Sequence, residues 1–421
     1  MRPDGTTYGR SRPGDEGQRR RPLRTRPTQG QPKSPLWAKL VIAFGVLVMV
    51  GSGLTVIVPK LVAHWALSNT PTVNAIPTDI KAPDIKGPIN FLLLGSDTRD
   101  SGGLSDIANA DSIVLVHIPA AHNQVYMISL PRDLYVPIAR DTETCADPGT
   151  HQNKINSAFG AGARDDQGHI DTSPTGRAKG ANLMLKTISC IVQDTGGLKF
   201  NGWATVNFDG FDKVVAAIGT VHMCTDTSWF PDQGIWSIHY YANGKQLPNN
   251  IASTAYYNYG NAAERATRDQ RAYYKKGCMD LKPWQALDLS RQRVQYSVGD
   301  YGRQQMQQRL LKAIVDKIAS PDTLTNLATV ARLQQATTGL MVLDLGGIAV
   351  ENWAVTLSGL RADDVIMVKT YAAANGTPNT ANVNGSSVVL LKPDLVDLLH
   401  HVQNDSVADF LTAHPDWLGG S

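Results

Sequence analysis

The longest apolar run lies near the N-terminus, from Leu40 to Pro59, and contains no charged side chain. A helix of twenty residues rises about 30 Å, which matches the thickness of the hydrocarbon core of a bilayer. Trp37 and Trp65 stand near its two ends, where aromatic rings favour the interface. A cleaved signal peptide would have an apolar core of about 7–15 residues and a small-residue cleavage site. We therefore expect a single transmembrane helix over residues 39–60.

Beyond residue 88 the pattern changes to short β-rich apolar runs that alternate with stretches of helical period. Each run is bounded by Gly, Asp, Asn or Pro, as is typical of buried strands. Strands are expected at residues 89–94, 112–118, 124–130, 364–370 and 386–391. Helices are expected at residues 177–193, 208–217, 283–290, 303–319 and 321–335, after Pro393, and at 404–413. Alternating strands and helices predict an α/β or α+β domain around a central sheet.

These patterns divide the chain into a tail, an anchor, a linker, a folded domain and a second tail. The expected bounds are 1–38 for the basic tail, 39–60 for the transmembrane helix, 61–87 for a proline-containing extracytoplasmic linker, 88–405 for the folded domain and 406–421 for the C-terminal tail. Residues 225–280 are less periodic and rich in Gly, Asn and Tyr, so we interpret them as a long insertion between two core elements.

The charges are distributed unevenly along the chain. Residues 1–39 contain ten Lys and Arg against three Asp and Glu, whereas the other 382 residues contain thirty against thirty-four. By the positive-inside rule the N-terminus should be cytoplasmic, which predicts a single-pass protein of the cell membrane with its folded domain outside. The tail has almost no large apolar side chains and cannot bury a core. A segment of about forty residues without a fold is a poor basis for sequence-specific nucleic-acid recognition.

The four cysteines all lie in the expected extracytoplasmic part. None has CxxC spacing, which argues against a zinc site, and an even number in an exported domain favours two disulfides. The spacing does not choose among the three possible pairings. We prefer Cys145–Cys190 with Cys224–Cys278, since the second pair would close the insertion.

Two carboxylates follow or begin predicted strands. Asp97 comes directly after the run that ends in Gly95 and Ser96, and Asp111 opens the next strand. Ligands commonly bind at such a strand edge, and carboxylate oxygens suit Mg²⁺, which also bridges substrate phosphates. Capping of loops by Asp is the simpler alternative and stays open at this point.

Arginines recur in the polar segments of the same domain. They are Arg99, Arg132, Arg291, Arg293 and Arg303. Guanidinium groups bind phosphate oxygens bidentately, so arginines that converge near carboxylates suggest a polyanionic ligand. For any single arginine, a surface ion pair is the simpler explanation. The chain has no GxSxG, P-loop, HExxH or GxGxxG in the required setting, which disfavours serine hydrolases, nucleotide kinases and zinc peptidases.

Taken together, these segments resemble the LytR-CpsA-Psr family of cell-envelope ligases. The shared features occur in the family's order: a short cytoplasmic tail, an anchor, LLLGSDTR, a DS dipeptide, SLPRD, KIN, a VNF–DGF segment, RQR and GDYGRQQMQQ. Each motif is weak alone, but their number and order are specific, and the likeness covers residues 88–400. The last two motifs are similar to the actinobacterial branch.

The resemblance implies an α/β/α sandwich with a mixed central sheet and a hydrophobic groove for a polyprenyl chain. It implies a phosphotransferase that moves a glycan-1-phosphate from a polyprenyl diphosphate carrier onto peptidoglycan, with Mg²⁺ as cofactor. With water as acceptor, the same site would be a diphosphate hydrolase. The implied partners are the polyprenyl diphosphate-linked glycopolymer, the peptidoglycan acceptor and the cytoplasmic membrane, with no nucleic acid.

The resemblance also implies roles for individual residues. Asp97 and Asp111 are similar to the family's carboxylates at Mg²⁺ and diphosphate, and Asp111 is favoured as the base on the acceptor hydroxyl. The implied catalytic set is Asp111, Arg132, Arg291 and Arg293. The implied diphosphate-binding set is Arg99, Arg132, Arg291, Arg293, Arg303 and Gln307. Asp300 is similar to the carboxylate that orients Arg293 or Arg303.

Three positions depart from the family pattern. Ala216 stands where the family often has Asp, Thr220 replaces a Gly, and Met306 replaces an Arg or His. These departures motivate an alternative hypothesis, a non-catalytic envelope protein that binds polyprenyl diphosphate or regulates assembly. Loss of turnover with retained lipid binding would distinguish it from the enzyme.

Overall fold

All described residues belong to one compact unit. The computed structural model describes residues 72–96, 109–141, 145, 150–225, 230–232, 234–247, 270–292, 295–296, 300–320, 326–337, 341–370 and 380–419. The expected tail 1–38 and transmembrane helix 39–60 lie outside these residues. No helix within the described ranges is both long and apolar enough to span a bilayer.

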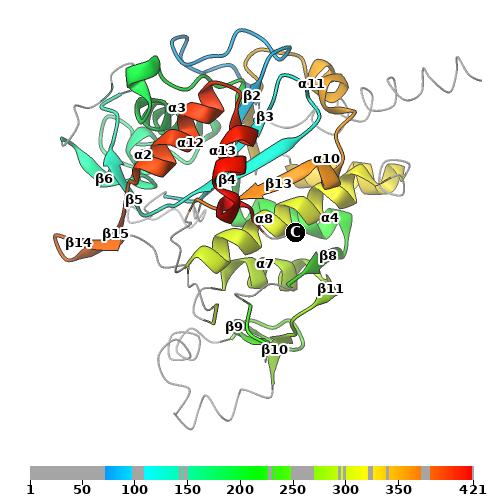
Figure 1. Ribbon diagram of the computed structural model, residues 1–421. Coiled ribbons are helices and arrows are strands. Elements are labelled where there is room, and N and C mark those ends of the chain that lie inside the picture. The colour runs from blue at the N-terminus through cyan, green and yellow to red at the C-terminus, as the bar shows by residue number, and fades with distance from the viewer. Residues whose placement is uncertain are drawn as a thin grey trace, which may run out of the picture. The chain divides into compact units, whose positions relative to one another are not determined.

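A seven-stranded mixed sheet lies at the centre of the described fold (Figure 1). Its strand order is β1-β12-β7-β2-β3-β4-β13. Its strands are β1 (Thr72–Val73), β2 (Ile89–Ser96), β3 (Ala110–Ile118), β4 (Val125–Leu130), β7 (Gly202–Asn207), β12 (Met341–Asp344) and β13 (Val365–Val368). The pairs β2–β3, β3–β4 and β7–β12 are antiparallel, and β2–β7, β4–β13 and β1–β12 are parallel. The expected fold class, a mixed α/β domain, is therefore confirmed.

Three smaller sheets accompany the main sheet. The four-stranded one has the order β14-β15-β5-β6, and the two-stranded ones are β10-β9 and β11-β8. Their strands are β5 (Leu134–Pro137), β6 (Gln152–Lys154), β8 (Val221–Cys224), β9 (Ile235–Tyr241), β10 (Arg271–Tyr274), β11 (Cys278–Leu281), β14 (Thr380–Val383) and β15 (Ser386–Leu390).

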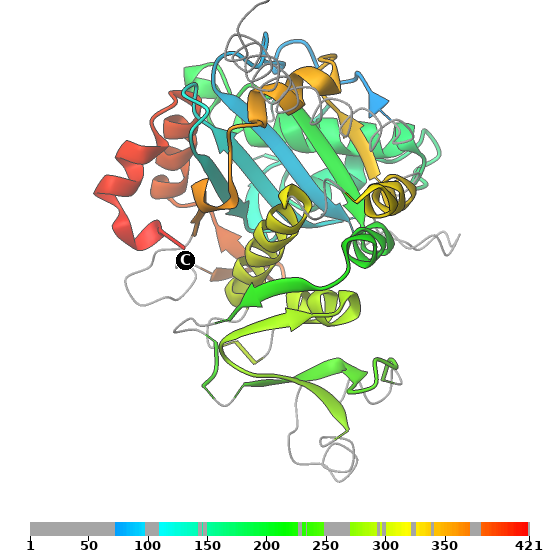
Figure 2. The ribbon, with the colours of Figure 1, turned by 90° about the vertical axis from the view of Figure 1, so that its right-hand side faces the viewer.

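Helices cover both faces of the main sheet (Figures 1 and 2). One face packs against α2 (Ser157–Gly162), α3 (Pro174–Cys190), α12 (Pro393–Gln403) and α13 (Val407–Ala413). The other meets α4 (Phe208–Ile218), α8 (Asp300–Ala319) and α11 (Val350–Leu357). The remaining elements are α7 (Pro283–Arg291), α10 (Leu327–Thr337) and the short 3₁₀ helices η1 (Gln193–Thr195), η3 (Ala362–Asp364) and η4 (Pro415–Trp417).

Local sequence explains where several of these helices begin. Pro174, Pro283 and Pro393 each occupy the first turn, where the missing N–H costs nothing and the fixed φ suits a helix. The Ser173 hydroxyl accepts a hydrogen bond from the Gly176 amide at 3.2 Å and caps α3.

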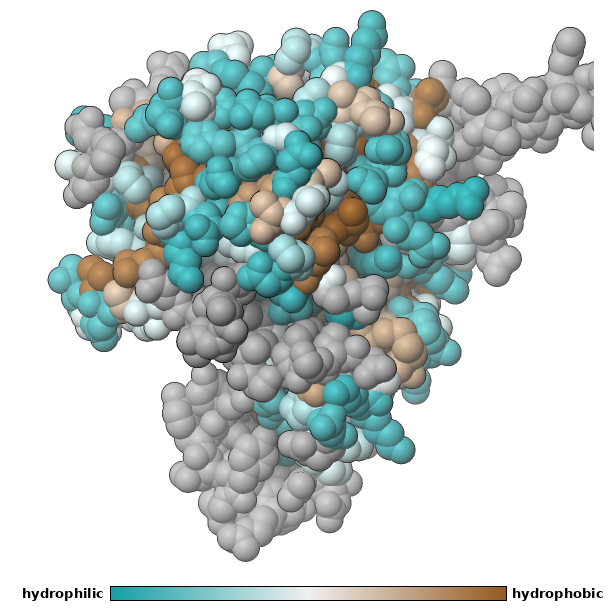
Figure 3. Space-filling model, in the orientation of Figure 1, coloured by the Kyte–Doolittle hydropathy of each residue, from teal (hydrophilic) through white to brown (hydrophobic). Residues whose placement is uncertain are grey.

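The described residues form two large apolar cores and a smaller cluster of Ile85, Ile89, Ile118 and Trp353. The larger lies between the main sheet and the α2, α3, α12 and α13 layer, and includes the buried rings of Phe159, Phe200, Trp203 and Phe410. The second joins α4, α7, α8 and α10 to β8, β9, β10 and β11. Figure 3 shows a largely hydrophilic surface over α3, α12 and α13 with small apolar patches, as expected for helices whose apolar sides face the core.

The second core changes the interpretation of residues 225–280. The sequence predicted an aperiodic insertion, but the segment contributes β9, β10 and β11 to a packed subdomain. Their runs are too short and too rich in Tyr, His and Ser to show a clear period. Strands β5, β6, β7, β12 and β14 were not among the expected strands either.

The expected linker 61–87 is partly built into the fold. β1 pairs with β12, and the buried Asp344 carboxylate accepts hydrogen bonds from the amides of Ala75 and Ile76 at 2.7 and 3.1 Å. A third amide, that of Gly346, donates at 2.8 Å. A buried carboxylate is tolerated when backbone donors satisfy it, so Asp344 fixes the start of the described chain to the sheet.

The expected C-terminal tail 406–421 is likewise part of the domain. α13 and η4 lie within it, and Phe410 and Trp417 are buried in the larger core. Their rings meet edge to face with centroids 5.1 Å apart. The apolar spacing in this segment is only two turns long, which is why it did not predict burial.

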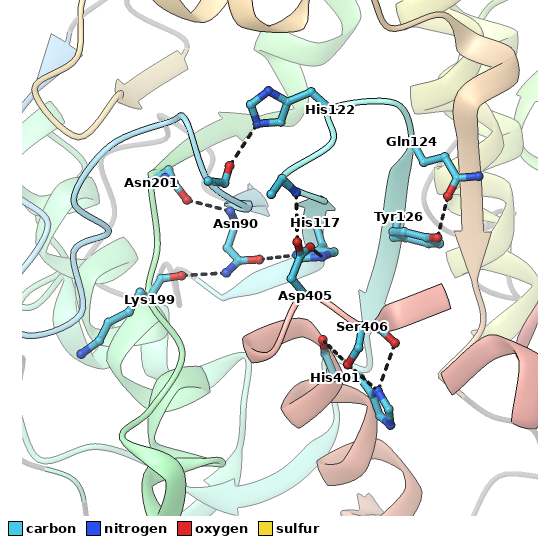
Figure 4. Close-up of polar contacts among 12 residues, drawn as sticks. Asn90, His117, His122, Gln124, Tyr126, Lys199, Asn201, His401, Asp405 and Ser406 are labelled. Carbon is cyan, nitrogen blue, oxygen red and sulfur yellow. Dashed lines mark hydrogen bonds and ion pairs between the residues drawn. The ribbon is translucent and has the colours of Figure 1, made fainter. Parts of the chain in front are cut away.

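A polar cluster fixes this C-terminal segment to the sheet (Figure 4). His117 is fully buried on β3; its Nδ1 lies 2.8 Å from Asn90 Oδ1 and its Nε2 lies 3.1 Å from Asp405 Oδ1. The second oxygen of Asp405 accepts a hydrogen bond from the Ala120 amide at 3.1 Å. Asn90 in turn donates to the carbonyl of Lys199 at 3.0 Å. The cluster thus joins β2, β3 and the α12–α13 turn.

The two disulfides have the preferred pairing. Cys145 is bonded to Cys190, and Cys224 is bonded to Cys278. The second disulfide joins directly opposed residues of β8 and β11, and so closes the insertion at its base.

Replacing Asp405 with Gly should lower the free energy of unfolding by about 1–3 kcal/mol, because the buried His117 and the Ala120 amide would lose their acceptor. Asp405 has φ 56°, so Gly removes the carboxylate without backbone strain. The matched variant Asp405→Asn also tolerates this φ and keeps an acceptor oxygen. Its free energy of unfolding should therefore fall less than that of Asp405→Gly. Urea denaturation measures both; equal midpoints for wild type and Asp405→Gly would contradict the role of the cluster.

Candidate active site

The directions of the strands bring the ends of several strands to one edge of the main sheet. β2, β4, β7 and β13 run the same way, and β3 runs against them. The carboxyl ends of those four strands therefore meet the start of β3, where Asp111 lies. An edge of this kind, outside the ends of parallel strands, is where α/β sheets commonly bind ligands.

A β-bulge sets the position of Asp111. Gly95 pairs with Ser112, but the next residue, Ser96, pairs with Ala110, so Asp111 is the extra residue on β3. A bulge interrupts the alternation of side chains and redirects the extra one, and bulges are common next to active sites. Asp111 keeps 17% of its side chain exposed at this edge.

Asp111 forms an ion pair with Arg132, which stands in the turn after β4. Arg132 Nη1 lies 2.6 Å from Asp111 Oδ1, and Arg132 Nε lies 3.6 Å from Asp133 Oδ2. The other oxygen of Asp133 is 3.0 Å from Lys154 Nζ. The four side chains form a connected row of alternating charge, each between 17% and 27% exposed, so both cations are held in place and remain accessible.

Backbone hydrogen bonds connect the KIN segment to this row. The Asn156 amide donates to the Arg132 carbonyl at 3.1 Å, and the Ile155 amide donates to the Leu134 carbonyl at 2.7 Å. The carbonyl of the buried Asn156 accepts from the Ala110 amide at 3.4 Å. Residues distant in sequence are thus joined around Asp111 and Arg132.

A second group of site residues lies at the end of α7. Arg291 is the last residue of the helix and is partly exposed, whereas Gln292 is extended and fully buried. Gln292 Nε2 donates to the carboxylate of Asp288 at 3.1 Å. Gln292, which stands between the two arginines of the RQR motif, therefore points inward.

The fully buried Asp288 connects α7 to the insertion. Besides Gln292, it accepts a hydrogen bond from the Tyr274 hydroxyl at 2.6 Å, and His239 Nδ1 lies 2.7 Å from its Oδ1. Burial and the Asp288 carboxylate raise the pKa of Tyr274, which keeps its hydroxyl a donor. Asp288 thereby fixes the helix turn that leads to Arg291.

Helix α8 carries the remaining described site residues. Arg303 is buried, and Gln307 Nε2 lies 3.5 Å from the Ser290 carbonyl at the end of α7. Gln308 donates to the carbonyls of Met127 and Val368, which holds α8 against β4 and β13. A Cβ on Gly302 would lie 2.6 Å from Tyr296 Cβ, so the glycine of the GDYGRQ motif permits close packing here.

The structure describes part of the predicted site. Asp111 and Arg132 are in contact, and Arg291 and Gln307 lie on two adjoining helices. Asp97, Arg99 and Arg293 lie outside the described residues, as does the side chain of Asp300, which begins α8. Sequence reasoning did not assign Asp133, Lys154 or Asp288 to the site. The SLPRD and KIN motifs contain the first two, but nothing local showed that they are neighbours.

The three departures from the family pattern differ in burial. Met306 is fully buried in the second core, whereas Ala216 and Thr220 are exposed at and just after the end of α4. Met306 therefore has a packing role, and the other two positions face solvent.

The chain matches one protein family over most of its length. The model of the LytR_cpsA_psr family covers residues 64–377. The chain is 28% identical over 240 residues to a polyisoprenyl-teichoic acid–peptidoglycan teichoic acid transferase, TagU of Oceanobacillus iheyensis, covering 57% of this chain and 54% of that protein. It is 23% identical over 246 residues to TagV of Bacillus subtilis, covering 58% and 48%. The chain thus spans about half the length of the curated relatives it matches.

A solved structure shares the fold. The protein gbs0355 from Streptococcus agalactiae matches with a TM-score of 0.51 and 20% identity, covering 77% of this chain and 91% of that one. The crystal structure of Bacillus subtilis TagV has a TM-score of 0.47 and 19% identity, covering 76% and 98%. At these identities the likeness concerns the fold alone.

Placing Arg at position 306 should destabilise the domain by at least about 3 kcal/mol, because an unpaired charge would enter the fully buried second core. Met306→Leu is the matched control and should cost less than about 1.5 kcal/mol, since it conserves volume. Thermal unfolding compares the two. If Met306→Arg were as stable as wild type, the assignment of Met306 to the core would be wrong.

Proposed function

The chain belongs to the LytR_cpsA_psr family, and we propose that it is a phosphotransferase that moves a glycan-1-phosphate from a polyprenyl diphosphate carrier onto peptidoglycan during cell-wall assembly. The observation that carries this proposal is the Asp111–Arg132 pair, which the bulge in β3 presents at the ligand-binding edge of the sheet. The names of the curated relatives, transferases that act between polyisoprenyl-linked teichoic acid and peptidoglycan, support the same reaction class.

The proposed reaction exchanges one phosphorus–oxygen bond for another. The acceptor hydroxyl oxygen attacks the phosphorus that carries the glycan, and its proton passes to the carboxylate of Asp111. The bond from that phosphorus to the bridging oxygen breaks, and polyprenyl phosphate leaves with the electron pair. With water as the acceptor, the same steps give hydrolysis as a side activity.

The cationic side chains stabilise the charge that develops on the leaving phosphate. Arg132 is already oriented by Asp111 and Asp133, so it needs little reorganisation when the diphosphate binds. Lys154, held by Asp133, adds a second positive charge beside it. Arg291 and Arg303, with Arg99 and Arg293, complete the proposed diphosphate clamp, and Gln307 adds a polar contact.

The donor set of the edge fits Mg²⁺. Asp111 offers a partly exposed carboxylate, and this ion usually takes one or two carboxylates and fills its shell with water and phosphate oxygens. Asp111 and Asp97 would hold it. When bound, the ion would supply charge neutralisation at the diphosphate oxygens. Asp300 is proposed to orient Arg293 or Arg303.

We further propose that residues 39–60 anchor the enzyme in the cell membrane with the N-terminus in the cytoplasm. The charge-free run from Leu40 to Pro59 and the excess of arginine before it support this orientation. The transferase domain would then face the cell wall and the head groups of its lipid-linked substrate.

Release of polyprenyl phosphate from a polyprenyl diphosphate sugar tests the reaction, using the full chain in detergent with Mg²⁺ and peptidoglycan oligomers. Arg132→Ala should lower kcat by roughly 100-fold or more, because it removes an oriented cation from the developing charge. Arg132→Lys keeps the charge without the bidentate geometry, so its kcat should lie between those of wild type and Arg132→Ala. The exposed Arg361 provides the control variant Arg361→Ala, which should match wild type.

Turnover that is unaffected by Arg132→Ala would refute this assignment of the site. Binding of the lipid without turnover, even with acceptor present, would favour the alternative of a non-catalytic polyprenyl-diphosphate-binding protein. The positions that motivated that alternative are a core methionine and two exposed residues, so the described structure gives it no further support.

Chelation of divalent cations by EDTA should reduce release of polyprenyl phosphate at least tenfold, and excess Mg²⁺ should restore it, because the diphosphate charge would be left incompletely neutralised. The same titration with Asp111→Asn should require more Mg²⁺ for half-maximal rate. Full activity in EDTA would contradict the metal assignment while leaving the role of Arg132 intact.

A further inference from the structure

The insertion carries a pair of aromatic side chains that the proposed reaction does not use. Trp236 on β9 and Tyr273 on β10 are directly opposed in the β-ladder, and their ring centroids lie 4.5 Å apart with a 42° tilt. Tyr273 is 38% exposed, one of only four large hydrophobic residues so exposed among those described, and Trp236 is half-buried. Figures 1 and 2 show this ribbon beyond α7, on the side away from the main sheet.

Contacts around the pair hold the backbone of Trp236 and the ring of Tyr273 in place. Gln295 accepts a hydrogen bond from the Trp236 amide at 2.9 Å and donates to its carbonyl at 2.5 Å, as a neighbouring strand would. Tyr273 packs on Gly234, where a Cβ would lie 2.6 Å from the phenol oxygen. Gly234 also has φ +74°, so both its conformation and the close contact exclude other residues. Rings fixed in this way lose little entropy when they bind a ligand.

Charged groups border the aromatic pair. Lys276 Nζ lies 2.6 Å from Asp232 Oδ1, and Asp232 is largely exposed, two residues before Gly234. The hydrogen bond and charge of Lys276 lower the pKa of Asp232, so the carboxylate is ionised at neutral pH. A membrane-inserting surface would instead place aliphatic side chains beside the rings and avoid a carboxylate near anionic lipid.

The pair is linked to the α7 end of the proposed diphosphate clamp through Gln295. Arg291 lies in the chain between two anchors to β9: Asp288, which contacts His239, and Gln295, which contacts Trp236. Gln295 is four positions after Arg291, so their Cα atoms are at most about 14 Å apart. Because Gln295 also contacts the Trp236 backbone, a glycan of several units bound through its diphosphate at Arg291 would extend over this part of the ribbon.

We propose that Trp236 and Tyr273 form a sugar-stacking subsite for the glycan of the polyprenyl diphosphate-linked donor. One face of a sugar ring carries C–H bonds of weak positive polarity, which pack against the negative face of an aromatic ring, while its hydroxyls bind carboxylate and ammonium groups at the rim. The inference rests on the proposed function, because the diphosphate fixes which end of the glycan meets the rings.

Binding of a series of short-chain substrates to the full chain in detergent tests the proposal. The probes are farnesyl diphosphate and farnesyl diphosphate carrying one, two or four N-acetylglucosamine units, measured by calorimetry. Wild-type affinity should rise by about three- to tenfold once the glycan reaches the rings, the value expected for one aromatic contact. Trp236→Ala and Tyr273→Ala should abolish this increment, measured as the ratio of affinities within each variant.

Conservative variants separate stacking from a folding defect. Trp236→Phe and Tyr273→Phe keep a ring and should keep most of the increment, and Val355→Ala, an exposed apolar residue on α11, should match wild type. An alanine variant that fails to unfold cooperatively is replaced by its serine counterpart. Equal affinity of wild type for all the probes would overturn the subsite alone, whereas failure to bind any of them would refute the proposed function as well.

Two further binding measurements show whether the Trp236–Tyr273 pair binds a different ligand. If free N-acetylglucosamine tetramer binds and depends on the rings, but lipid-linked sugar does not, the pair serves the peptidoglycan acceptor and the donor assignment is wrong. If the alanine variants lose only co-sedimentation with phosphatidylglycerol vesicles, the pair contacts membrane and the sugar subsite is overturned.

Discussion

The antiparallel ladder between β2 and β3 is the constraint on which the site depends. It runs from Ile89 opposite Ile118 to Ser96 opposite Ala110, at the centre of the seven-stranded sheet. This pairing sets β3 against the direction of its neighbours, which brings the start of one strand to the carboxyl ends of four others. The single bulge in the ladder then determines that Asp111 faces Arg132. A shift of one residue would exchange the faces of every side chain beyond it.

Carboxylates that are buried, as in Asp344 and Asp288, or partly buried, as in Asp405, join segments that are distant in the chain. Asp344 binds the amide of Ala75 across 269 residues, Asp288 joins α7 to β9 and β10, and Asp405 joins the C-terminal helices to β3. A carboxylate pays for burial only through several donors, so each of these side chains specifies one arrangement of its neighbours. Hydrogen-bonded carboxylates thus attach the N-terminal segment, the C-terminal segment and the insertion to the rest of the domain.

The second apolar core gives the insertion its functional position. Because α7 and α8 pack on it together with β8–β11, the arginine-bearing end of α7 and the aromatic ribbon belong to one rigid group of elements. Met306 shows the consequence, since a position that looks like a lost charged residue is required for packing. The disulfide between β8 and β11 restrains the same region.

Sequence alone determined the mixed α/β class, the bounds of β2, β3 and β4 to within two residues, and the motif order that identifies the family. These features are local, because apolar runs and turn residues report which faces of a segment are buried. It also indicated Asp111 and Arg132 as site residues, but not that they are in contact. Only the tertiary structure decided the bulge, the partners Asp133 and Lys154, the inward direction of Gln292 and the burial of Trp417. Each depends on the register of paired strands or on hydrogen bonds between distant residues, and neither leaves a periodic trace in the chain.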